Sequence, residues 1–137
     1  MARVLAIDYG RKRTGLAVTD PLQLIASGLT TVPTAELFAF VEEYIKQEEV
    51  ELILVGEPKQ RDGSASDIEE RIAKFVRRLR QEIPQIPVER ADERFTSKMA
   101  FQAMIDGGLR KKKRADKGLV DKVSATIILQ DYLERKQ

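Results

Sequence analysis

The sequence predicts an α/β protein with a mixed five-stranded sheet, three antiparallel strands followed by two parallel ones, and helices on both faces. Three apolar runs of strand length come first, over residues 3–8, 15–19 and 24–32, with no helical pattern between them. After residue 33, amphipathic helical patterns alternate with apolar runs, as in right-handed crossovers between parallel strands. The chain of 137 residues fits a single domain over 1–137, since domains commonly have about 100–150 residues.

The first strand, Arg3–Asp8, and the returning strand, Gly15–Thr19, predict a hairpin around a turn rich in glycine and basic residues. The third strand is expected over residues 24–32. Apolar residues three and four positions apart then predict a helix over residues 35–48. The continuous apolar run 51–55 suits a central parallel strand that is covered on both faces.

A capping-box pattern, Ser66 with Glu69, predicts the start of a second helix that Pro84 ends. A last strand is expected over residues 87–91. Thr96 or Ser97 then begins a third helix, and a fourth runs over residues 119–134. The expected order of elements is therefore βββαβαβαα.

The sequence contains no cysteine and no histidine, which excludes thiol nucleophiles, zinc sites of these residues and imidazole catalysis. A bound metal must be held by oxygen atoms, which suits Mg²⁺ or Mn²⁺. The missing cysteines fit a reducing compartment, so a cytoplasmic location is expected. No apolar stretch is long enough for a signal peptide or a membrane span, so no membrane partner is expected.

The net charge is only +2, so an anionic partner must be argued from where the charges lie. Residues 110–117 carry a local excess of five positive charges and include Lys111, Lys112 and Lys113. This segment is expected to contact nucleic acid electrostatically. The alternative is a solvated, flexible segment.

Asp8 ends the first strand and is followed by a turn containing Gly10, where a phosphate could approach the backbone. The turn is not a P-loop, because Leu16 and Ala17 replace the required Lys and Ser or Thr. Asp8 is a candidate metal ligand. The alternative is an aspartate that only caps the turn.

Asp92 and Glu93 follow the last strand, where one of them is a second candidate ligand. Neighbouring residues of a strand point to opposite faces, so at most one of the two faces the site of Asp8. Glu93 is favoured for its longer reach. The alternative is that the pair caps the next helix.

Asp121 lies in line with Ala125, Ile128 and Tyr132 on the last predicted helix, and this apolar stripe should face the sheet. An inward carboxylate is costly unless it is paired or holds a metal, which makes Asp121 a third candidate. The alternative is a position in the exposed first turn, where the helix dipole favours a negative charge.

Four ordered motifs resemble the YqgF (RuvX) family of bacterial nuclease-like proteins, in the ribonuclease H-like superfamily with the Holliday-junction resolvase RuvC. They are Asp8-x-Gly10-x-x-Arg13-x-Gly15-x-Ala17, Val55-Gly56-x-Pro58 with Asp62-Gly63, Asp92-Glu93-Arg94-x-Thr96, and Asp121-x-x-Ser124-Ala125-x-x-Ile128-Leu129-Gln130. The resemblance covers nearly the whole chain. It implies a ribonuclease H-like fold with an acidic cluster of Asp8, Glu93 and Asp121.

One departure from the family pattern is Glu57, where an apolar residue is usual. Resolvase relatives place a catalytic glutamate at the end of the central strand, so the second ligand is either Glu93 or Glu57, with Glu93 favoured. Near the same edge, residues expected to bind the substrate are Arg11, Arg13, Lys59, Arg94 and Thr96, besides the lysines of the basic segment.

The resemblance implies a phosphodiesterase assisted by one or two divalent ions, which matures the 5′ end of the 16S ribosomal RNA precursor in ribosome biogenesis. A first alternative is a Holliday-junction resolvase acting on branched DNA, which requires a dimer. A second is a nucleic-acid-binding protein without catalysis. The expected oligomeric state is a monomer or a homodimer.

Overall fold

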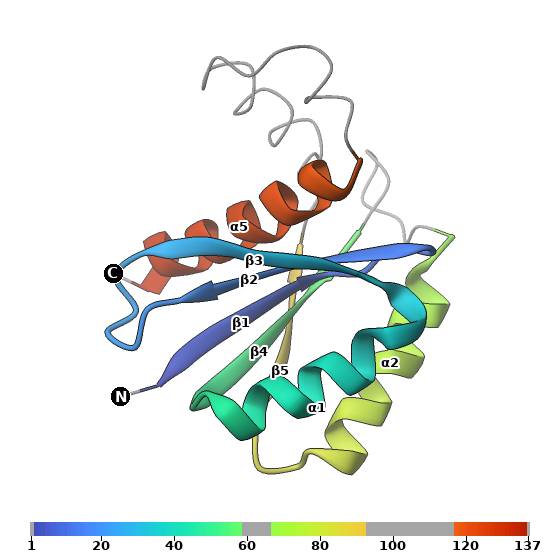
Figure 1. Ribbon diagram of the computed structural model, residues 1–137, viewed down its shortest axis with the longest axis horizontal. Helices are drawn as coiled ribbons and strands as arrows, with labels where there is room; N and C mark the ends of the chain where they lie inside the picture. The colour runs from blue at the N-terminus through green and yellow to red at the C-terminus, as the bar shows by residue number, and fades with distance from the viewer. Residues whose placement is uncertain (1, 59–66, 93–116, 137) are drawn as a thin grey trace.

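The computed structural model describes residues 2–58, 67–92 and 117–136, with the backbone alone for residues 117–121 and 136. These residues form five strands, a short 3₁₀ helix and three α-helices (Figure 1). In chain order the elements are β1 (Arg3–Asp8), β2 (Arg13–Thr19), β3 (Ala26–Pro33), η1 (Thr34–Glu36), α1 (Leu37–Gln47), β4 (Val50–Glu57), α2 (Glu69–Glu82), β5 (Val88–Asp92) and α5 (Lys117–Lys136).

The five strands form one sheet in the order β3-β2-β1-β4-β5. The first three strands are antiparallel to one another, while β4 runs parallel to both β1 and β5. The predicted mixed sheet is therefore confirmed. Because β1, β4 and β5 are parallel, their carboxyl ends meet at one edge of the sheet.

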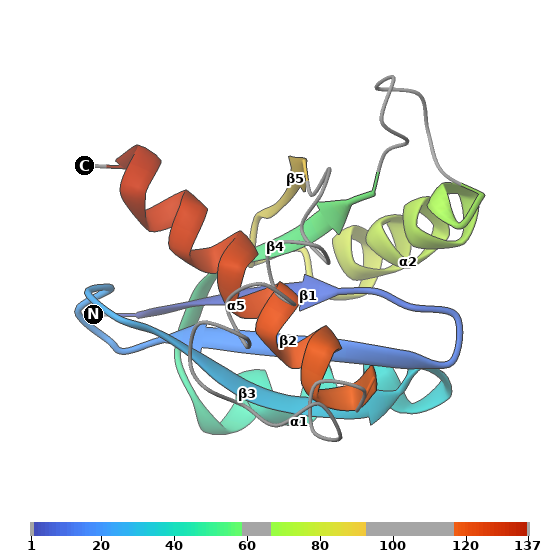
Figure 2. The ribbon, with the colours of Figure 1, turned by 90° about the horizontal axis from the view of Figure 1, so that it is seen from above.

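Helices cover both faces of the sheet, with α5 on one side and α1 and α2 on the other (Figures 1 and 2). Alternate residues of each strand supply two separate cores. On the α5 face the core residues include Val4, Ala6, Ala17, Leu52 and Leu54, and on the α1 and α2 face they include Leu5, Ile7, Leu16, Ile53 and Val55. None of the helices in the described ranges is long and apolar enough to cross a membrane.

Most differences from the sequence prediction are shifts of one or two residues at the ends of elements. The start of α2 has a physical cause: the helix begins at Glu69, with Ile68 at the N-cap and no side-chain cap. Glu69 is therefore the first residue of the helix rather than the third, and its carboxylate binds Arg90 on β5. The capping box predicted Ser66 as the N-cap and Glu69 as the third residue of the helix, and this is wrong because Ile68 is the N-cap. Ser66 itself lies outside the described residues.

The predicted third helix, from Thr96 or Ser97, also lies outside the described residues. The last helix, α5, extends two residues beyond the prediction at each end.

Candidate active site

Asp8 is the last residue of β1 and lies at the edge where the parallel strands end. It continues the alternation of Val4 and Ala6, whose side chains pack under α5. Asp8 therefore belongs to the α5 face of the sheet. Its side chain is only partly buried and takes part in further interactions.

The strand positions on either side of Asp8 are glycines. Gly15 of β2 is its partner in the antiparallel register, and Gly56 of β4 follows Val55, the partner of Ile7. Neither neighbour carries a side chain, so the sheet beside the Asp8 carboxylate is lined by backbone. A phosphate or a hydrated ion can approach a carboxylate in such surroundings without displacing a side chain.

Glu57 and Asp92 are paired in the register of β4 with β5. Glu57 continues the alternation of Ile53 and Val55, which pack under α1 and α2. Both acids therefore lie at the same edge as Asp8 but on the opposite face of the sheet. This geometry disfavours Glu57 as a partner of Asp8.

The helix α5 crosses the α5 face diagonally (Figure 2). Near its start, the stem of Lys122 lies against Gly28 of β3, where an added Cβ would come within 2.8 Å of the lysine Cγ. Near its end, burial raises the pKa of Tyr132, and the charges of Glu89 on β5 and of Glu51 near the start of β4 add to the shift. The helix thus begins at the edge of the sheet where Asp8 lies.

Asp121 lies one turn before Ala125, which is fully buried against this face. Ile128 is also buried, and Tyr132 packs at the margin of the same core, so the predicted inward stripe is confirmed for these three residues. The side chain of Asp121 is outside the described part of the structure. Ser124, one turn along, has a buried hydroxyl with no hydrogen-bond partner among the described residues.

Several predicted site residues lie outside the described ranges, namely Lys59, Glu93, Arg94, Thr96, Lys111, Lys112 and Lys113. Within the described ranges, no group of three or more acidic side chains could hold a metal ion. Asp8 is thus the one member of the expected acidic cluster whose side chain is described. Its oxygen donors suit a hard cation such as Mg²⁺ or Mn²⁺.

Hydroxyl groups fix the turn between Asp8 and β2. The Gly10 amide donates to Thr14 Oγ1 at 3.5 Å, and the Thr34 hydroxyl donates to the Gly10 carbonyl at 2.6 Å. The hydroxyl oxygens of Thr14 and Thr34 are 2.9 Å apart. Because the Thr34 proton is donated to the Gly10 carbonyl, the Thr14 hydroxyl donates to Thr34 and completes a ring of hydrogen bonds. The turn is thereby tied to the start of η1.

The two basic residues predicted to bind phosphate in this turn differ in exposure. Arg11 is exposed at the tip, whereas Arg13 is partly buried as the first residue of β2. Arg13 shares the alternation of Gly15 and Ala17, which places it on the face of Asp8. Arg13 is therefore better placed than Arg11 to bind a phosphate that approaches the sheet beside Asp8.

Arg90, on β5, was not singled out from the sequence. Its guanidinium makes a bidentate ion pair with Glu69 at 2.6 and 2.8 Å, and donates to the carbonyls of Val55 and Gly56 at 3.2 and 3.0 Å. Arg90 thus joins the start of α2 to the end of β4. It fixes the backbone of Gly56, the glycine beside Asp8.

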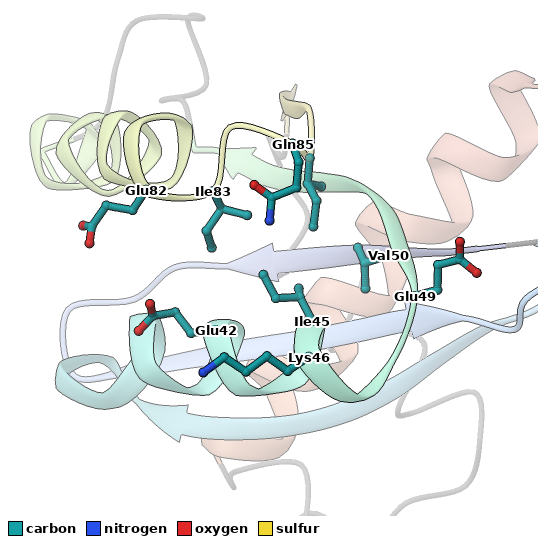
Figure 3. A pocket seen from close by; sticks show the side chains of 9 residues that line it. Glu42, Ile45, Lys46, Glu49, Val50, Glu82, Ile83 and Gln85 are labelled. Atoms are coloured by element: carbon teal, nitrogen blue, oxygen red, sulfur yellow. The ribbon is translucent and has the colours of Figure 1, made fainter.

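Two grooves between α1 and α2 have opposite charge. The groove at the end of the sheet remote from Asp8 has an aliphatic floor that includes Ile45, Val50 and Ile83, and its rim carries three glutamates and one lysine (Figure 3). The groove at the Asp8 end is lined by three cations and no acid. A polyanion is therefore attracted to the Asp8 end of this face.

The sequence matches a known family over nearly its full length. The family model described as RuvX, Holliday junction resolvase, matches residues 2–135. The chain belongs to the RuvX family. Christiangramia forsetii has a protein named "Putative pre-16S rRNA nuclease" that is 62% identical over 133 residues, which cover 97% of this chain and 98% of the relative. A protein of Phocaeicola vulgatus with the same name is 61% identical over 137 residues, covering 100% and 99%.

Solved structures of resolvases share the fold of this RuvX protein. RuvC of T. thermophilus, in complex with a Holliday junction substrate, superimposes with a TM-score of 0.57 at 21% identity, over 99% of this chain and 96% of RuvC. The Fowlpox virus resolvase with its junction DNA gives a TM-score of 0.55 at 12% identity, covering 98% of both chains. These similarities confirm the expected ribonuclease H-like, resolvase-type fold.

Proposed function

We propose that this RuvX protein is a metal-dependent nuclease that processes the 5′ end of the 16S ribosomal RNA precursor in the cytoplasm. The observation that carries the proposal is the position of Asp8, a carboxylate between two glycines at the carboxyl edge of the sheet, on the face that α5 covers. The high identity to relatives named as pre-16S rRNA nucleases supports the choice of substrate.

The proposed metal ligands are Asp8, Glu93 and Asp121. Asp121 belongs to the turn of α5 that precedes Ala125, which packs on the face of Asp8. Ala91, two residues before Glu93 in the sequence, belongs to the same face, whereas Asp92 and Glu57 belong to the other. We therefore favour Glu93 over Glu57 as the second acidic ligand.

When bound, Mg²⁺ or Mn²⁺ would activate a water for attack on the phosphodiester and stabilise the leaving oxygen. The chain itself would hold the substrate. We assign Arg13 and Arg11 to the phosphates beside the cleaved bond, together with Lys59, Arg94 and Thr96. The basic lysines 111–113 would add electrostatic contact that does not depend on sequence.

A cleavage assay with two matched variants tests this proposal. The purified protein is incubated with an RNA containing the 5′ end of the 16S precursor, with chelator and with Mg²⁺ or Mn²⁺. We expect Asp8→Asn to abolish metal-dependent cleavage and Glu57→Gln to retain it within a few fold, because Glu57 lies on the opposite face. Full activity in excess chelator, or loss of activity in Glu57→Gln alone, would contradict the assignment.

The family description, Holliday junction resolvase, makes junction cleavage the second candidate. A synthetic four-way junction in the same assay separates the two, since a resolvase cuts it symmetrically and leaves the RNA intact. Binding of both substrates without cleavage of either, at any metal concentration, would favour a binding protein without catalysis.

A further inference from the structure

A cationic groove of about 360 Å³ lies on the α1 and α2 face at the same end of the sheet as Asp8. Tyr9 is one of the residues that line it. Asp8 and Tyr9 are consecutive, and Tyr9 packs against the core of the α1 and α2 face while Asp8 belongs to the other face. The groove and the proposed catalytic carboxylate are therefore at the same end of the sheet, on opposite faces, and consecutive residues of the chain contribute to them.

Three cations line one side of this groove at helical spacing. Arg71, Lys74 and Arg78 are exposed on α2, three and four residues apart, and span about 10 Å along the helix axis. None of the acidic residues in the described ranges forms an ion pair with Arg71 or Lys74. Their charges are therefore available to a ligand with more than one negative group.

Aromatic rings form the floor of the groove. The ring centroids of Tyr9 and Phe75 are 5.5 Å apart, and those of Phe38 and Phe75 are 6.5 Å apart in an edge-to-face contact. The Arg78 guanidinium lies over the Phe38 ring, 3.7 Å from its centroid, and its Nε is 2.7 Å from Glu82. Two neighbours thus hold this guanidinium in place, yet the side chain is 56% exposed and can stack on a base.

We propose that this groove binds an unpaired segment of the RNA substrate that flanks the cleaved phosphodiester. Its phosphates would pair with Arg71 and Lys74, and one base would stack against Tyr9 and the Arg78 guanidinium. Phe38 and Phe75 are buried, so the partly exposed Tyr9 is the ring that a base can reach. A duplex keeps the faces of its bases stacked inside, so the ligand is a single strand. The identity of the strand as RNA rests on the proposed function.

Binding measured without cleavage tests the phosphate contacts. Fluorescence anisotropy of a labelled single-stranded RNA is recorded in chelator over a range of salt concentrations, for Arg71→Gln/Lys74→Gln and for the control Lys46→Gln/Arg77→Gln. The control removes the same charge at exposed positions outside the groove. We expect the slope of log affinity against log salt to fall by about 0.7 per lost contact in the groove variant and to change much less in the control.

Variants of Tyr9 test the stacking contact. Tyr9→Leu keeps an apolar side chain but removes the ring, so we expect single-strand affinity to fall about tenfold and the affinity for a fully paired RNA to stay the same. Tyr9→Phe should retain both affinities. Circular dichroism spectra that match the parent would show that each variant is folded.

The outcomes separate this inference from the proposed function. A salt slope that is unchanged in the groove variant, or reduced equally in the control, overturns the groove assignment even if the parent cleaves its RNA. A selective loss in the groove variant supports the assignment even if the parent cleaves nothing, in which case the nuclease proposal fails alone. An equal loss of single-strand and duplex affinity in Tyr9→Leu overturns the stacking contact.

Discussion

At the scale of single residues, Gly10 shows why the turn after Asp8 tolerates little change. A Cβ at this position would come within 2.2 Å of the Arg13 carbonyl oxygen, a backbone atom that cannot rotate away. We expect Gly10→Ala to lower the free energy of unfolding by about 1–3 kcal/mol, because the turn must open to fit the methyl group. Urea denaturation measures this change.

The control is Arg11→Ala, at the exposed tip of the same turn. Its effect on stability should stay within about 0.5 kcal/mol. If Gly10→Ala unfolds at the same urea concentration as the parent, the close approach of Gly10 to Arg13 is not a constraint on this turn.

Asp121 gives a prediction in which the proposed role and the alternative differ in sign. If it shares a site with Asp8 and Glu93, like charges oppose each other in chelator, so Asp121→Asn should melt at a higher temperature than the parent. The variant should also lose the extra stabilisation that Mg²⁺ gives the parent, and its cleavage activity. Thermal melts with chelator and with metal measure both effects.

An aspartate that only complements the helix dipole behaves differently. Its removal would cost about 0.3–1 kcal/mol with or without metal and would leave cleavage intact. Asp131→Asn is the matched control on the same helix, since Asp131 is half exposed and pairs with Arg135 at 3.0 Å. This change should leave the response to metal unaltered.

At the scale of elements, the Arg90 contacts join α2, β4 and β5. A lysine cannot reproduce the bidentate pair with Glu69 and the bonds to two carbonyls, so Arg90→Lys should destabilise the protein. Both side chains are about one-fifth exposed, so we expect a loss of about 1–3 kcal/mol, below the cost of breaking a fully buried pair. Arg135→Lys, in an exposed pair, should change stability by less than about 0.5 kcal/mol.

The loop between β2 and β3 gives a dependence on pH. The Asp20 carboxylate accepts backbone N–H groups of Leu22, Leu24 and Ile25 at 3.2, 2.8 and 2.8 Å. These hydrogen bonds hold the pKa of Asp20 below its ordinary value of 3.8, and the bond from Ile25 has the largest effect. A depressed pKa in the folded state means that the stabilisation is present above about pH 4 and is lost as the pH falls through the folded pKa.

We therefore expect Asp20→Asn to be less stable than the parent at pH 7, and the difference to shrink as the pH falls below about 4. Urea denaturation at a series of pH values measures it. A difference that grows toward acid pH would show that the carboxylate does not act through its charged form.

Local patterns were sufficient to predict five strands and the helices α1 and α2, because β1, β2 and β4 contain compact apolar runs and α1 and α2 carry clear amphipathic stripes. The start of α2 could not be predicted in this way. Glu69 binds a residue 21 positions away, and no local motif contains that information. Likewise, β2 begins at Arg13 rather than Gly15, because Thr14 is buried within the hydroxyl ring that Thr34 completes.

Across the whole molecule, the sequence correctly predicted that Asp8 ends the first strand and that the apolar stripe of α5 faces the sheet, but it did not predict the groove near this end of the sheet. Tyr9, Phe38 and Phe75 are far apart in the chain and no motif joins them, so the aromatic floor became visible only when β1, α1 and α2 were packed together. The register of β1 with β4 was equally hidden. It places Glu57 on the opposite face of the sheet from Asp8, a distinction that sequence spacing could not make.

The position of α5 in the chain has a consequence for biosynthesis. The apolar residues of one entire face of the sheet, Val4, Ala6, Ala17, Leu52 and Leu54, are made early, and the helix that covers them lies after residue 116. While α5 is still inside the ribosome, this face of the nascent chain is open to water and the fold cannot be completed. The same helix carries Asp121. A chain whose synthesis ends before α5 therefore has neither a complete core nor a complete set of the proposed metal ligands. The order of the elements thus ties nuclease activity to the completion of translation.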